Sequence, residues 1–238
     1  MRAIDKLNVK LFADGADRAD MLEMYEKPYI RGFTTNPTLM KKAGIVGYED
    51  FAHEILKEIP DRPISFEVFA DDFDEMERQA LKIRTWGENV YVKIPVSNTR
   101  REMSYALIER LSGSGVHLNI TAILTLDQVR KVAGAVRNGP ASVVSVFAGR
   151  IADTGLDPVP VMSEALEILE LAPQAELLWA SPREVLNIYQ ADTIGCHIIT
   201  ATNDILRKLS LSGKDLAEYS LETVQMFYDD ADRAGYTL

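Results

Sequence analysis

Lys93 is the only charged residue in NVYVKIPV (89–96), an apolar run with the length and composition of a buried strand. Burial disfavours the ammonium form of a lysine, so the amine becomes available as a nucleophile near neutral pH. A neutral amine attacks a ketone carbonyl, and the resulting iminium withdraws electrons from the adjacent carbon–carbon bond. A lysine in such a run can instead extend to solvent or pair with a carboxylate. The position of Lys93 favours Schiff-base chemistry over this structural alternative.

Two carboxylates occupy similar positions in other apolar runs. Asp14 ends the run VKLFAD, and Glu67 lies inside ISFEVFA. Near a lysine, two such groups offer general acid–base capacity. Taken alone, Asp14 is better explained as a loop or cap residue before Gly15 than as a functional group. Glu67 has no such explanation, because a carboxylate inside an apolar run is costly unless it is paired or functional.

Short polar side chains interrupt several further apolar runs, where an amide or hydroxyl can bind a substrate. These candidates are Thr35 and Asn36 in TTNPT, Asn119 and Thr121 in the fifth run, and Ser145, with Phe147, in the sixth. Asn36 can instead be a structural turn residue, because Pro37 follows it and favours an extended conformation in the residue before a proline.

The formal net charge of −10 argues against nucleic acid or an anionic membrane as a partner. Any anionic substrate therefore requires local arginines. Arg150 and Arg183 follow the sixth and seventh apolar runs and meet this requirement. Ser181 is predicted to cap a helix there, whose free N–H groups would face a phosphate.

Several further classes are excluded by composition. His53, His117 and His197 lie far apart without metal-ligand spacing, so we expect no metal and no metal-dependent aldolase. No run approaches the roughly 20 apolar residues of a membrane span. The first residues, MRAIDKLNVKLFADG, lack a signal-peptide pattern, and Cys196 is the single cysteine. We therefore expect a cytoplasmic protein without disulfides.

The elements that must position these residues recur along the chain as a short apolar run followed by a longer helical pattern. The runs are 9–14, 30–36, 64–70, 89–96, 115–121, 142–148, 176–181 and 193–199. Eight such units predict a single (β/α)8 TIM-barrel domain over 1–238. A doubly wound fold is the runner-up, but DGADRADM after the first run lacks its glycine-rich loop.

The helices between the runs begin with recognisable caps. Asp72, the capping-box pair Thr125 and Gln128, and Asp157 before Pro158 are three examples. Ser181, Pro182 and Glu184 have the same spacing, so a helix is predicted from Ser181. An additional C-terminal helix is expected at about 213–235, capped by Ser212. It either closes the bottom of the barrel or crosses to a neighbouring subunit.

Three segments in this order resemble the signature segments of the transaldolase family, in particular its short subfamily that includes fructose-6-phosphate aldolases. They are TTNPT (34–38), YVKIP (91–95) and FAGRIADTG (147–155). The similarity runs from FADGAD to the C-terminal helix, nearly the whole chain. The chain is much shorter than the common transaldolases of central metabolism, which leaves the sugar undefined.

The resemblance implies a role for each candidate. Lys93 is similar to the Schiff-base lysine, and Asp14 to the acid–base group that takes the C4 hydroxyl proton. Glu67 and Thr121 resemble the pair that holds the catalytic water. The implied substrate-binding residues are Thr35, Asn36, Asn119, Ser145 and Phe147, with Arg150, Ser181 and Arg183 near the phosphate.

The resemblance further implies transfer of a dihydroxyacetone unit from a ketose phosphate to an aldose phosphate, without metal or other cofactor. Aldolases of the subfamily tend to carry glutamine at position 67 and tyrosine at 147, whereas this chain has Glu67 and Phe147. A fructose-6-phosphate aldolase, another class I aldolase such as the deoxyribose-phosphate type, and a non-catalytic phosphosugar-binding barrel remain alternatives. A homo-oligomer, pentameric or decameric, is implied, as is a place in the pentose phosphate pathway.

Overall fold

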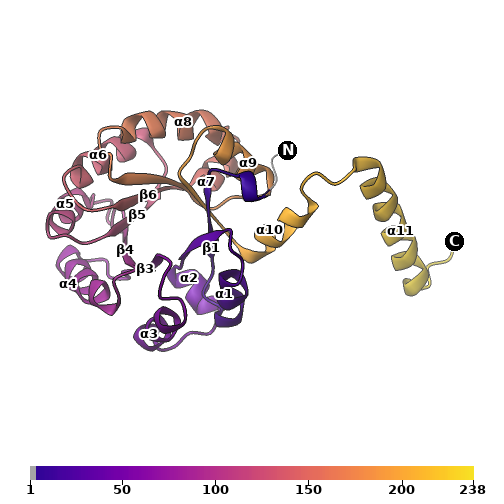
Figure 1. The fold of residues 1–238 in the computed structure, drawn as a ribbon, viewed down its shortest axis with the longest axis horizontal. Coiled ribbons are helices and arrows are strands. Elements are labelled where there is room, and N and C mark those ends of the chain that lie inside the picture. Colours follow the sequence, from indigo (N-terminus) through magenta and orange to yellow (C-terminus); the bar gives the residue numbers. More distant parts are fainter. Residues whose placement is uncertain (1–3) are drawn as a thin grey trace.

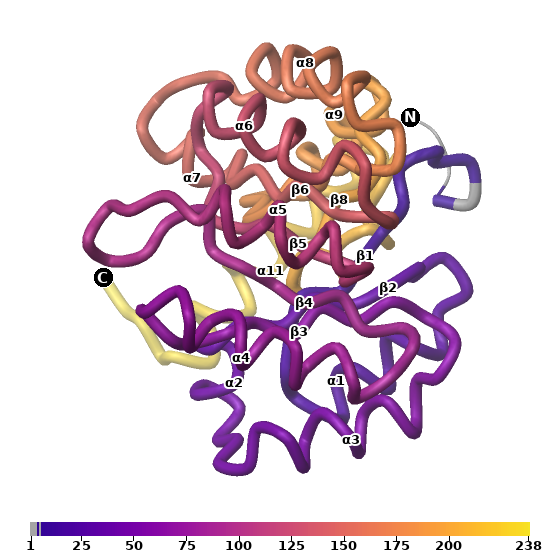
Figure 2. The backbone as a smooth tube through the Cα atoms, turned by 90° about the vertical axis from the view of Figure 1, so that its left-hand side faces the viewer, coloured from indigo at the N-terminus to yellow at the C-terminus, as the bar shows by residue number. Residues whose placement is uncertain are grey.

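The computed structural model describes residues 4–238, apart from the side chain of Asp5. Eight parallel strands form a closed barrel in chain order, and β1 (Lys10–Asp14) pairs with both β2 (Ile30–Thr34) and β8 (Ile198–Ala201). The strands between them are β3 (Ile64–Glu67), β4 (Val90–Pro95), β5 (Leu118–Ile123), β6 (Ser142–Val146) and β7 (Ala175–Trp179). The predicted TIM barrel is confirmed, and the open doubly wound alternative is wrong. The pairing of β1 with β8 closes the ring, which Figure 2 shows from the side.

Helices surround the barrel (Figure 1). They are α1 (Arg18–Tyr25), α2 (Pro37–Lys42), α3 (Tyr48–Glu58), α4 (Phe73–Ile83), α5 (Tyr105–Gly113), α6 (Leu126–Val136), α7 (Ala148–Asp153), α8 (Pro158–Leu169), α9 (Leu186–Thr193) and α10 (Asn203–Arg207). Short 3-10 helices lie at Ile4–Lys6, Arg84–Trp86 and Lys208–Leu211. In the described part of the chain, no helix is long and apolar enough to cross a membrane.

Apolar side chains fill both faces of the sheet, as the continuous apolar runs predicted. Most buried side chains pack between the strands and the surrounding helices. A smaller cluster lies inside the barrel and includes Phe12, Val143 and Leu178. The ring of Phe12 lies against Gly32, where a Cβ atom would stand 2.5 Å from it. Glycine at this position therefore lets one aromatic ring fill the barrel interior.

Most of the predicted caps are present. Asp72 and Asp157 accept backbone N–H groups at the starts of α4 and α8, and Thr125 and Gln128 form a complete capping box on α6. The helix predicted from Ser181 is wrong, because Ser181 has a left-handed backbone with φ of 61° and α9 begins only at Leu186. The spacing of a capping box is met there, but the backbone of its first residue does not permit the cap.

Most strand boundaries differ from the predicted runs by a few residues, and the eighth strand and the C-terminal helix differ most clearly. The eighth run, predicted at 193–199, overlaps its strand only at its last two residues, because Thr193 still ends α9 and Gly195 turns the chain with φ of 78°. Strand β8 then continues to Ala201. The C-terminal helix α11 spans Leu216–Ala234 and is capped by Asp215, not by Ser212.

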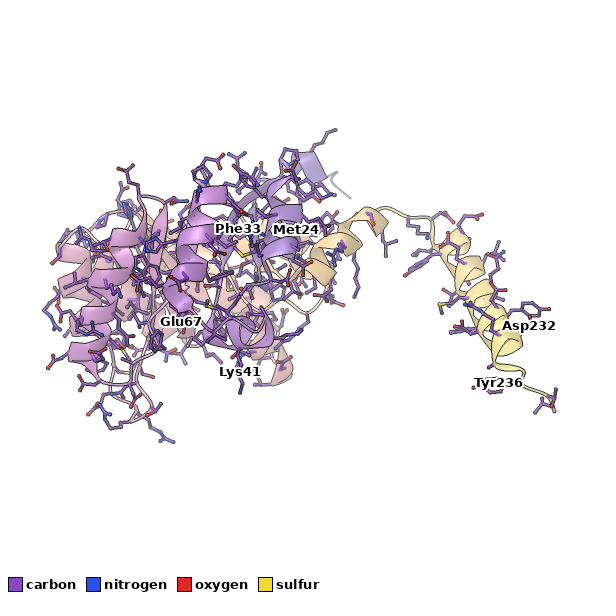
Figure 3. All side chains as sticks on the ribbon, turned by 90° about the horizontal axis from the view of Figure 1, so that it is seen from below. Met24, Phe33, Lys41, Glu67, Asp232 and Tyr236 are labelled. Atoms are coloured by element: carbon purple, nitrogen blue, oxygen red, sulfur yellow. The ribbon has the colours of Figure 1, made fainter. Side chains whose placement is uncertain are left out.

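Helix α11 extends away from the barrel as an arm (Figure 1). None of its residues is buried. Figure 3 shows Asp232 and Tyr236 at the far end of this arm, well separated from the strands. The arm does not close the bottom of its own barrel, one of the two positions considered from the sequence.

Candidate active site

The predicted polar residues converge on a cavity of about 120 Å³ at the carboxyl ends of the strands, where β/α barrels place their active sites. The predicted residues that line it are Asp14, Asn36, Lys93, Thr121, Ser145, Phe147, Arg150 and Ser181. Thr34, Leu178, Ala180 and Thr200 also line it. The cavity has room for a fragment of a few carbon atoms, and a longer substrate must extend through its mouth.

The Lys93 amine lies inside the barrel, between a carboxylate and the cavity. Its side chain is 8% exposed. Nζ donates to the carbonyl oxygen of Thr35 at 2.9 Å and lies 3.2 Å from Oε2 of Glu67. Strand pairing explains this contact, since Glu67 and Lys93 are partners in the β3–β4 register. The amine is therefore accessible from the cavity and has a proton acceptor beside it.

Glu67 and Thr35 contact Lys93 but do not line the cavity. Glu67 is the last residue of β3, and the Thr35 hydroxyl donates to the carbonyl oxygen of Ser65. Thr35 thus meets Lys93 through its backbone. Tyr48 donates to the Glu67 carbonyl oxygen, and burial raises the pKa of that phenol. These hydrogen bonds hold the backbone at Thr35 and at Glu67, the two residues that contact the Lys93 amine.

Asp14 is the last residue of β1 and faces the cavity. Its Oδ1 accepts a hydrogen bond of 2.6 Å from the Thr34 hydroxyl. Burial raises the pKa of the Asp14 carboxyl above 3.8, while the nearby charge of Lys93 and the Thr34 hydrogen bond oppose this increase. The carboxyl thus has the environment of a proton-transfer group.

Thr121 presents a buried hydroxyl that has no hydrogen-bond partner among the described residues. The next residue, Ala122, has a left-handed backbone with φ of 62°, and the β5–β6 register shifts there. Irregularities of this kind often re-aim a side chain near an active site. An unpaired buried hydroxyl that lines a cavity is suited to hold a water molecule or a substrate oxygen.

Asn119 is 1% exposed and lies behind the cavity wall. Its amide nitrogen donates to Ser65 Oγ at 2.9 Å, and its oxygen accepts from Ser145 Oγ at 2.6 Å. Ser145 therefore lines the cavity with its hydrogen directed at Asn119. Asn36, by contrast, lines the cavity while its side-chain oxygen caps α2 by accepting from Leu39. Its amide N–H groups have no partner in the described structure.

The positive side of the site is formed by Arg150. This guanidinium is exposed, stands 5.5 Å from the centre of the Phe147 ring, and forms no ion pair in the part of the chain described. Arg183 lies outside the cavity and forms a two-point ion pair with Asp153. The structure thus brings Arg150 and Ser181 to the site, but not Arg183.

The position of Ser181 depends on Gly149 in α7. A Cβ atom at Gly149 would stand 1.5 Å from the Ser181 carbonyl oxygen. The Gly149 N–H donates to the Ala180 carbonyl oxygen at 3.3 Å. Only a residue without a side chain permits this approach of the loop after β7 to the start of α7.

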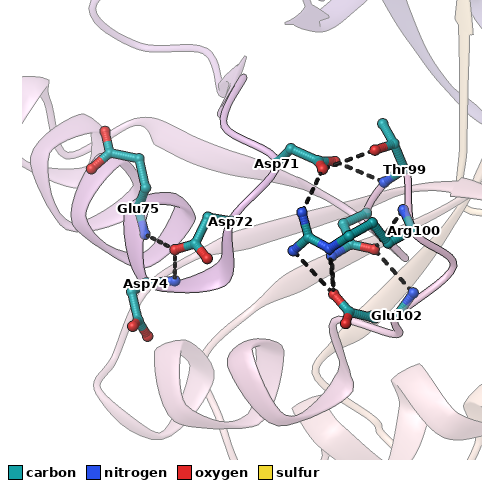
Figure 4. A network of polar contacts seen from close by, with 8 residues as sticks. Asp71, Asp72, Asp74, Glu75, Thr99, Arg100 and Glu102 are labelled. Atoms are coloured by element: carbon teal, nitrogen blue, oxygen red, sulfur yellow. Dashed lines mark hydrogen bonds and ion pairs between the residues drawn. The ribbon is translucent and has the colours of Figure 1, made fainter.

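A polar network holds two loops at the mouth of the barrel (Figure 4). Asp71, which follows β3, accepts from the backbone and hydroxyl of Thr99 and pairs with Arg100, both of which follow β4. Arg100 also pairs with Glu102. The loops after the strands that carry Glu67 and Lys93 are thereby joined.

The described residues contain no group of three or more histidine, cysteine, aspartate or glutamate side chains placed to hold a metal ion. The arrangement instead consists of an amine, two carboxylates and several hydroxyl groups. Such groups can exchange protons and supply a nucleophile at the carboxyl ends of the strands.

The chain belongs to the transaldolase/fructose-6-phosphate aldolase family, whose model matches residues 11–238. It is 32% identical over 202 residues to a probable transaldolase of Dehalococcoides mccartyi, covering 84% of this chain and 90% of the relative. A probable transaldolase of Methanococcus maripaludis strain C7 is 35% identical over 205 residues, covering 84% and 89%. One of Streptococcus pyogenes strain Manfredo is 33% identical over 203 residues, covering 85% and 90%.

Solved structures support the fold alone. The putative copper homeostasis protein CutC of Streptococcus agalactiae superimposes with a TM-score of 0.61 at 12% identity, covering 82% of this chain and 98% of that one. Dihydrodipicolinate synthase of Rhodopseudomonas palustris gives 0.57 at 13% identity, covering 93% and 80%. Identities this low carry no functional inference.

Proposed function

We propose that the protein is a transaldolase that transfers a dihydroxyacetone unit from a ketose phosphate to an aldose phosphate through a Schiff base on Lys93. The observation that carries this proposal is the Lys93 amine, which lies 3.2 Å from Glu67 and opens on a cavity that Asp14 also lines. Family membership and the names of its relatives support the reaction class.

The first step requires a neutral amine. Glu67 is placed to accept a proton from Lys93, whose nitrogen then attacks the C2 carbonyl of the donor. Loss of water from the carbinolamine gives the iminium. The free hydroxyl of Thr121 supplies a position for that water and for the water that later hydrolyses the product iminium.

Carbon–carbon cleavage follows. Asp14 takes the C4 hydroxyl proton, C4 becomes a carbonyl, and the electron pair of the C3–C4 bond moves into an enamine stabilised by the Lys93 nitrogen. The aldose phosphate leaves, and the three-carbon enamine adds to a second aldehyde. Asn36 and Ser145 are proposed to orient the fragment, with Asn119 acting through Ser145.

The phosphate is proposed to bind outside the small cavity, at Arg150 and Ser181. An arginine without an ion pair is available for a phosphate. Arg183 is proposed to contribute through Asp153 and the loop that carries Ser181, because its own guanidinium is already occupied.

The alternative is a fructose-6-phosphate aldolase, in which water releases free dihydroxyacetone. Phe147 lines the cavity and cannot donate a hydrogen bond or activate water, which favours transfer. A non-catalytic phosphosugar-binding barrel would retain Arg150 and Ser181, but would have no use for Lys93 facing Glu67.

Borohydride reduction with fructose 6-phosphate and other ketose phosphates, followed by mass spectrometry, tests the proposal. We expect the dihydroxyacetone adduct on Lys93, its loss in Lys93→Ala, and its retention in Lys41→Ala, which removes an exposed lysine from α2. Persistent trapping in the Lys93 variant would overturn the assignment. The same assay ranks the donors.

We further propose that the protein acts as a homo-oligomer, pentameric or decameric, in the cytoplasm and in the pentose phosphate pathway. The exposed apolar side chains of α11 support the oligomer. They are Leu216, Tyr219, Leu221, Val224, Met226, Phe227 and Tyr228. Water contact with so many large apolar groups on one helix is costly unless a second copy covers them.

A further inference from the structure

A chain of two hydroxyl groups leads from β8 to the Asp14 carboxylate. Thr200 lines the cavity and is 5% exposed, and Thr34 is 2% exposed. The Thr200 and Thr34 hydroxyl oxygens are 2.6 Å apart, and Thr34 Oγ1 is 2.6 Å from Asp14 Oδ1. Three neighbouring strands, β8, β1 and β2, thus join at the proposed acid–base group.

The direction of the chain follows from proton counting. An ionised carboxylate only accepts hydrogen bonds, so Thr34 must donate its single hydroxyl hydrogen to Asp14. Thr34 then has no hydrogen left for Thr200, and Thr200 must donate to Thr34. The order is therefore Thr200 to Thr34 to Asp14, and each bond polarises the next.

The two oxygens of Asp14 consequently differ. Oδ1 is held by Thr34, whereas Oδ2 forms no hydrogen bond with the residues that the structure describes. We propose that Thr34 and Thr200 are positioning residues for carbon–carbon bond cleavage, which hold Asp14 by Oδ1 and leave Oδ2 to exchange the proton of the C4 hydroxyl. This inference rests on the proposed transaldolase reaction and extends it to two residues on β2 and β8.

The proton balance is consistent with this arrangement. During cleavage the C4 hydroxyl proton moves to Oδ2, the O–H pair becomes part of the new carbonyl, and the C3–C4 pair enters the enamine. Oδ1 of the neutral carboxyl remains an acceptor, so the bond from Thr34 persists in both protonation states. When the enamine adds to the acceptor aldehyde, Asp14 can return the proton from Oδ2 to the alkoxide that forms, without rotating.

Other charges also act on Asp14. Lys93 on β4 lowers the pKa of the carboxyl, and Glu67 on β3 lies against that amine. Arg150, after β6, faces the same cavity. Burial raises the pKa of Asp14, and the charge of Lys93 and the Thr34 hydrogen bond lower it. Removal of the Thr34 hydroxyl leaves the charged groups in place, so it isolates the contribution of the hydrogen bond.

Thr34→Val and Thr200→Val remove each hydroxyl with little change of shape, and Thr34→Ser and Thr200→Ser restore it. We expect Thr34→Val to slow donor cleavage by about tenfold to hundredfold, with KM altered less than about threefold, because acid–base positioning acts on the transition state. Thr200→Val should slow it by about threefold to tenfold through the weaker polarisation of Thr34. Both serine variants should lie near the wild type.

The pH dependence of Asp14 distinguishes a positioning role of the Thr34 hydroxyl from a role in packing alone. Thr34→Val should raise the pH at which Asp14 titrates, followed by carboxyl ¹³C NMR and by the acidic limb of the cleavage rate. Ser142→Ala removes a buried β6 hydroxyl that donates to Pro140, and it should leave the Asp14 titration unchanged. The proposed positioning role would be refuted by an unshifted Asp14 titration in Thr34→Val, or by serine variants whose cleavage rate is as low as that of the valine variants.

Lys93 trapping distinguishes this outcome from failure of the proposed function. If the wild type is trapped on Lys93 but the Asp14 titration does not shift in Thr34→Val, the transaldolase proposal stands and the positioning role of Thr34 is refuted. If the wild type is not trapped, the proposed reaction is refuted, whereas the NMR titration still reports whether Thr34 holds Asp14. If Thr34→Val does not fold, Thr200→Val against Thr200→Ser gives the same comparison.

Discussion

Asp14 must be a carboxylate to accept a proton, yet it lies where burial favours the neutral acid. The hydrogen bond from Thr34 and the charge of Lys93 counter this effect, and the pKa nevertheless remains above 3.8. We expect the buried Asp14 carboxylate to contribute to catalysis at the expense of folding stability. Replacing Asp14 therefore measures its effect on catalysis and its effect on stability separately.

We expect Asp14→Asn to retain borohydride trapping on Lys93 but to lose donor cleavage by about a hundredfold or more. The raised pKa of folded Asp14 also fixes the sign of its effect on stability. Above pH 3.8 the unfolded chain ionises first, so the wild type loses stability as the pH rises toward the folded pKa.

Calorimetry across this pH range checks that sign. The melting temperature of Asp14→Asn relative to the wild type should increase with pH above about 4 and then level off. A difference that falls with pH would mean that the carboxylate stabilises the fold, contrary to its environment. Glu176→Gln, which alters a partly exposed carboxylate paired with Lys10 at the other end of the barrel, is the control.

Phe147 lines the cavity with an apolar ring, where the proposed enamine would be held. We expect Phe147→Tyr to increase release of free dihydroxyacetone relative to transfer by about tenfold, since a phenol can position a water molecule. The ratio of the two products, measured with and without acceptor aldehyde, tests this. An unchanged ratio would show that the Phe147 ring does not favour transfer over release of free dihydroxyacetone.

The sequence predicted most of the residues around the cavity because polar groups in apolar runs are conspicuous. Thr34 was contained in TTNPT but not singled out, and Thr200 lay beyond the predicted end of the eighth run. Asn119 was identified correctly as a buried polar group, whereas Glu67 is only partly buried. Side-chain contacts alone show that both stand behind the cavity wall. Periodicity places a residue on a strand and leaves its hydrogen-bond partners undetermined.

At the scale of elements, strand identity was easier to predict than the loops that shape the site. Parallel buried strands produce long apolar runs, so the barrel was evident. The loop after β7 was predicted as a helix start, whereas Ser181 adopts a left-handed backbone against Gly149. That conformation depends on a contact between α7 and the loop, which are distant in sequence.

Gly149→Ala tests this contact. We expect it to weaken sugar-phosphate binding by about tenfold and to lower the melting temperature, because the new methyl group collides with the Ser181 backbone. Gly134→Ala, in the exposed middle of α6 with no atom within 4 Å of the added Cβ, is the matched control. It should stabilise the protein by up to about 1 kcal/mol through helix propensity. Equal effects of the two changes would show that the close approach at Gly149 is unimportant.

At the scale of the whole molecule, the barrel encloses the site, and the arm carries a group of exposed large apolar side chains. Helix α11 is about 28 Å long at 1.5 Å per residue, enough to cross the face of a second barrel. Glu218, Glu222 and Gln225 lie on one side of the helix at helical spacing, and Leu216, Val224 and Phe227 lie on the other. This division predicts which face a second copy covers.

Phe227→Glu and Gln225→Glu introduce the same charge on opposite sides of α11. Both positions are exposed in the single chain, so neither change should disturb the barrel, and Lys93 trapping should persist in both. We expect Phe227→Glu to raise the dissociation constant of the oligomer about thirtyfold or more, as loss of a central aromatic contact does. Gln225→Glu should leave it within about threefold. Light scattering after size-exclusion chromatography over a concentration series measures both. If the two variants assemble like the wild type, the arm is not the contact between subunits, and its apolar face must meet another partner.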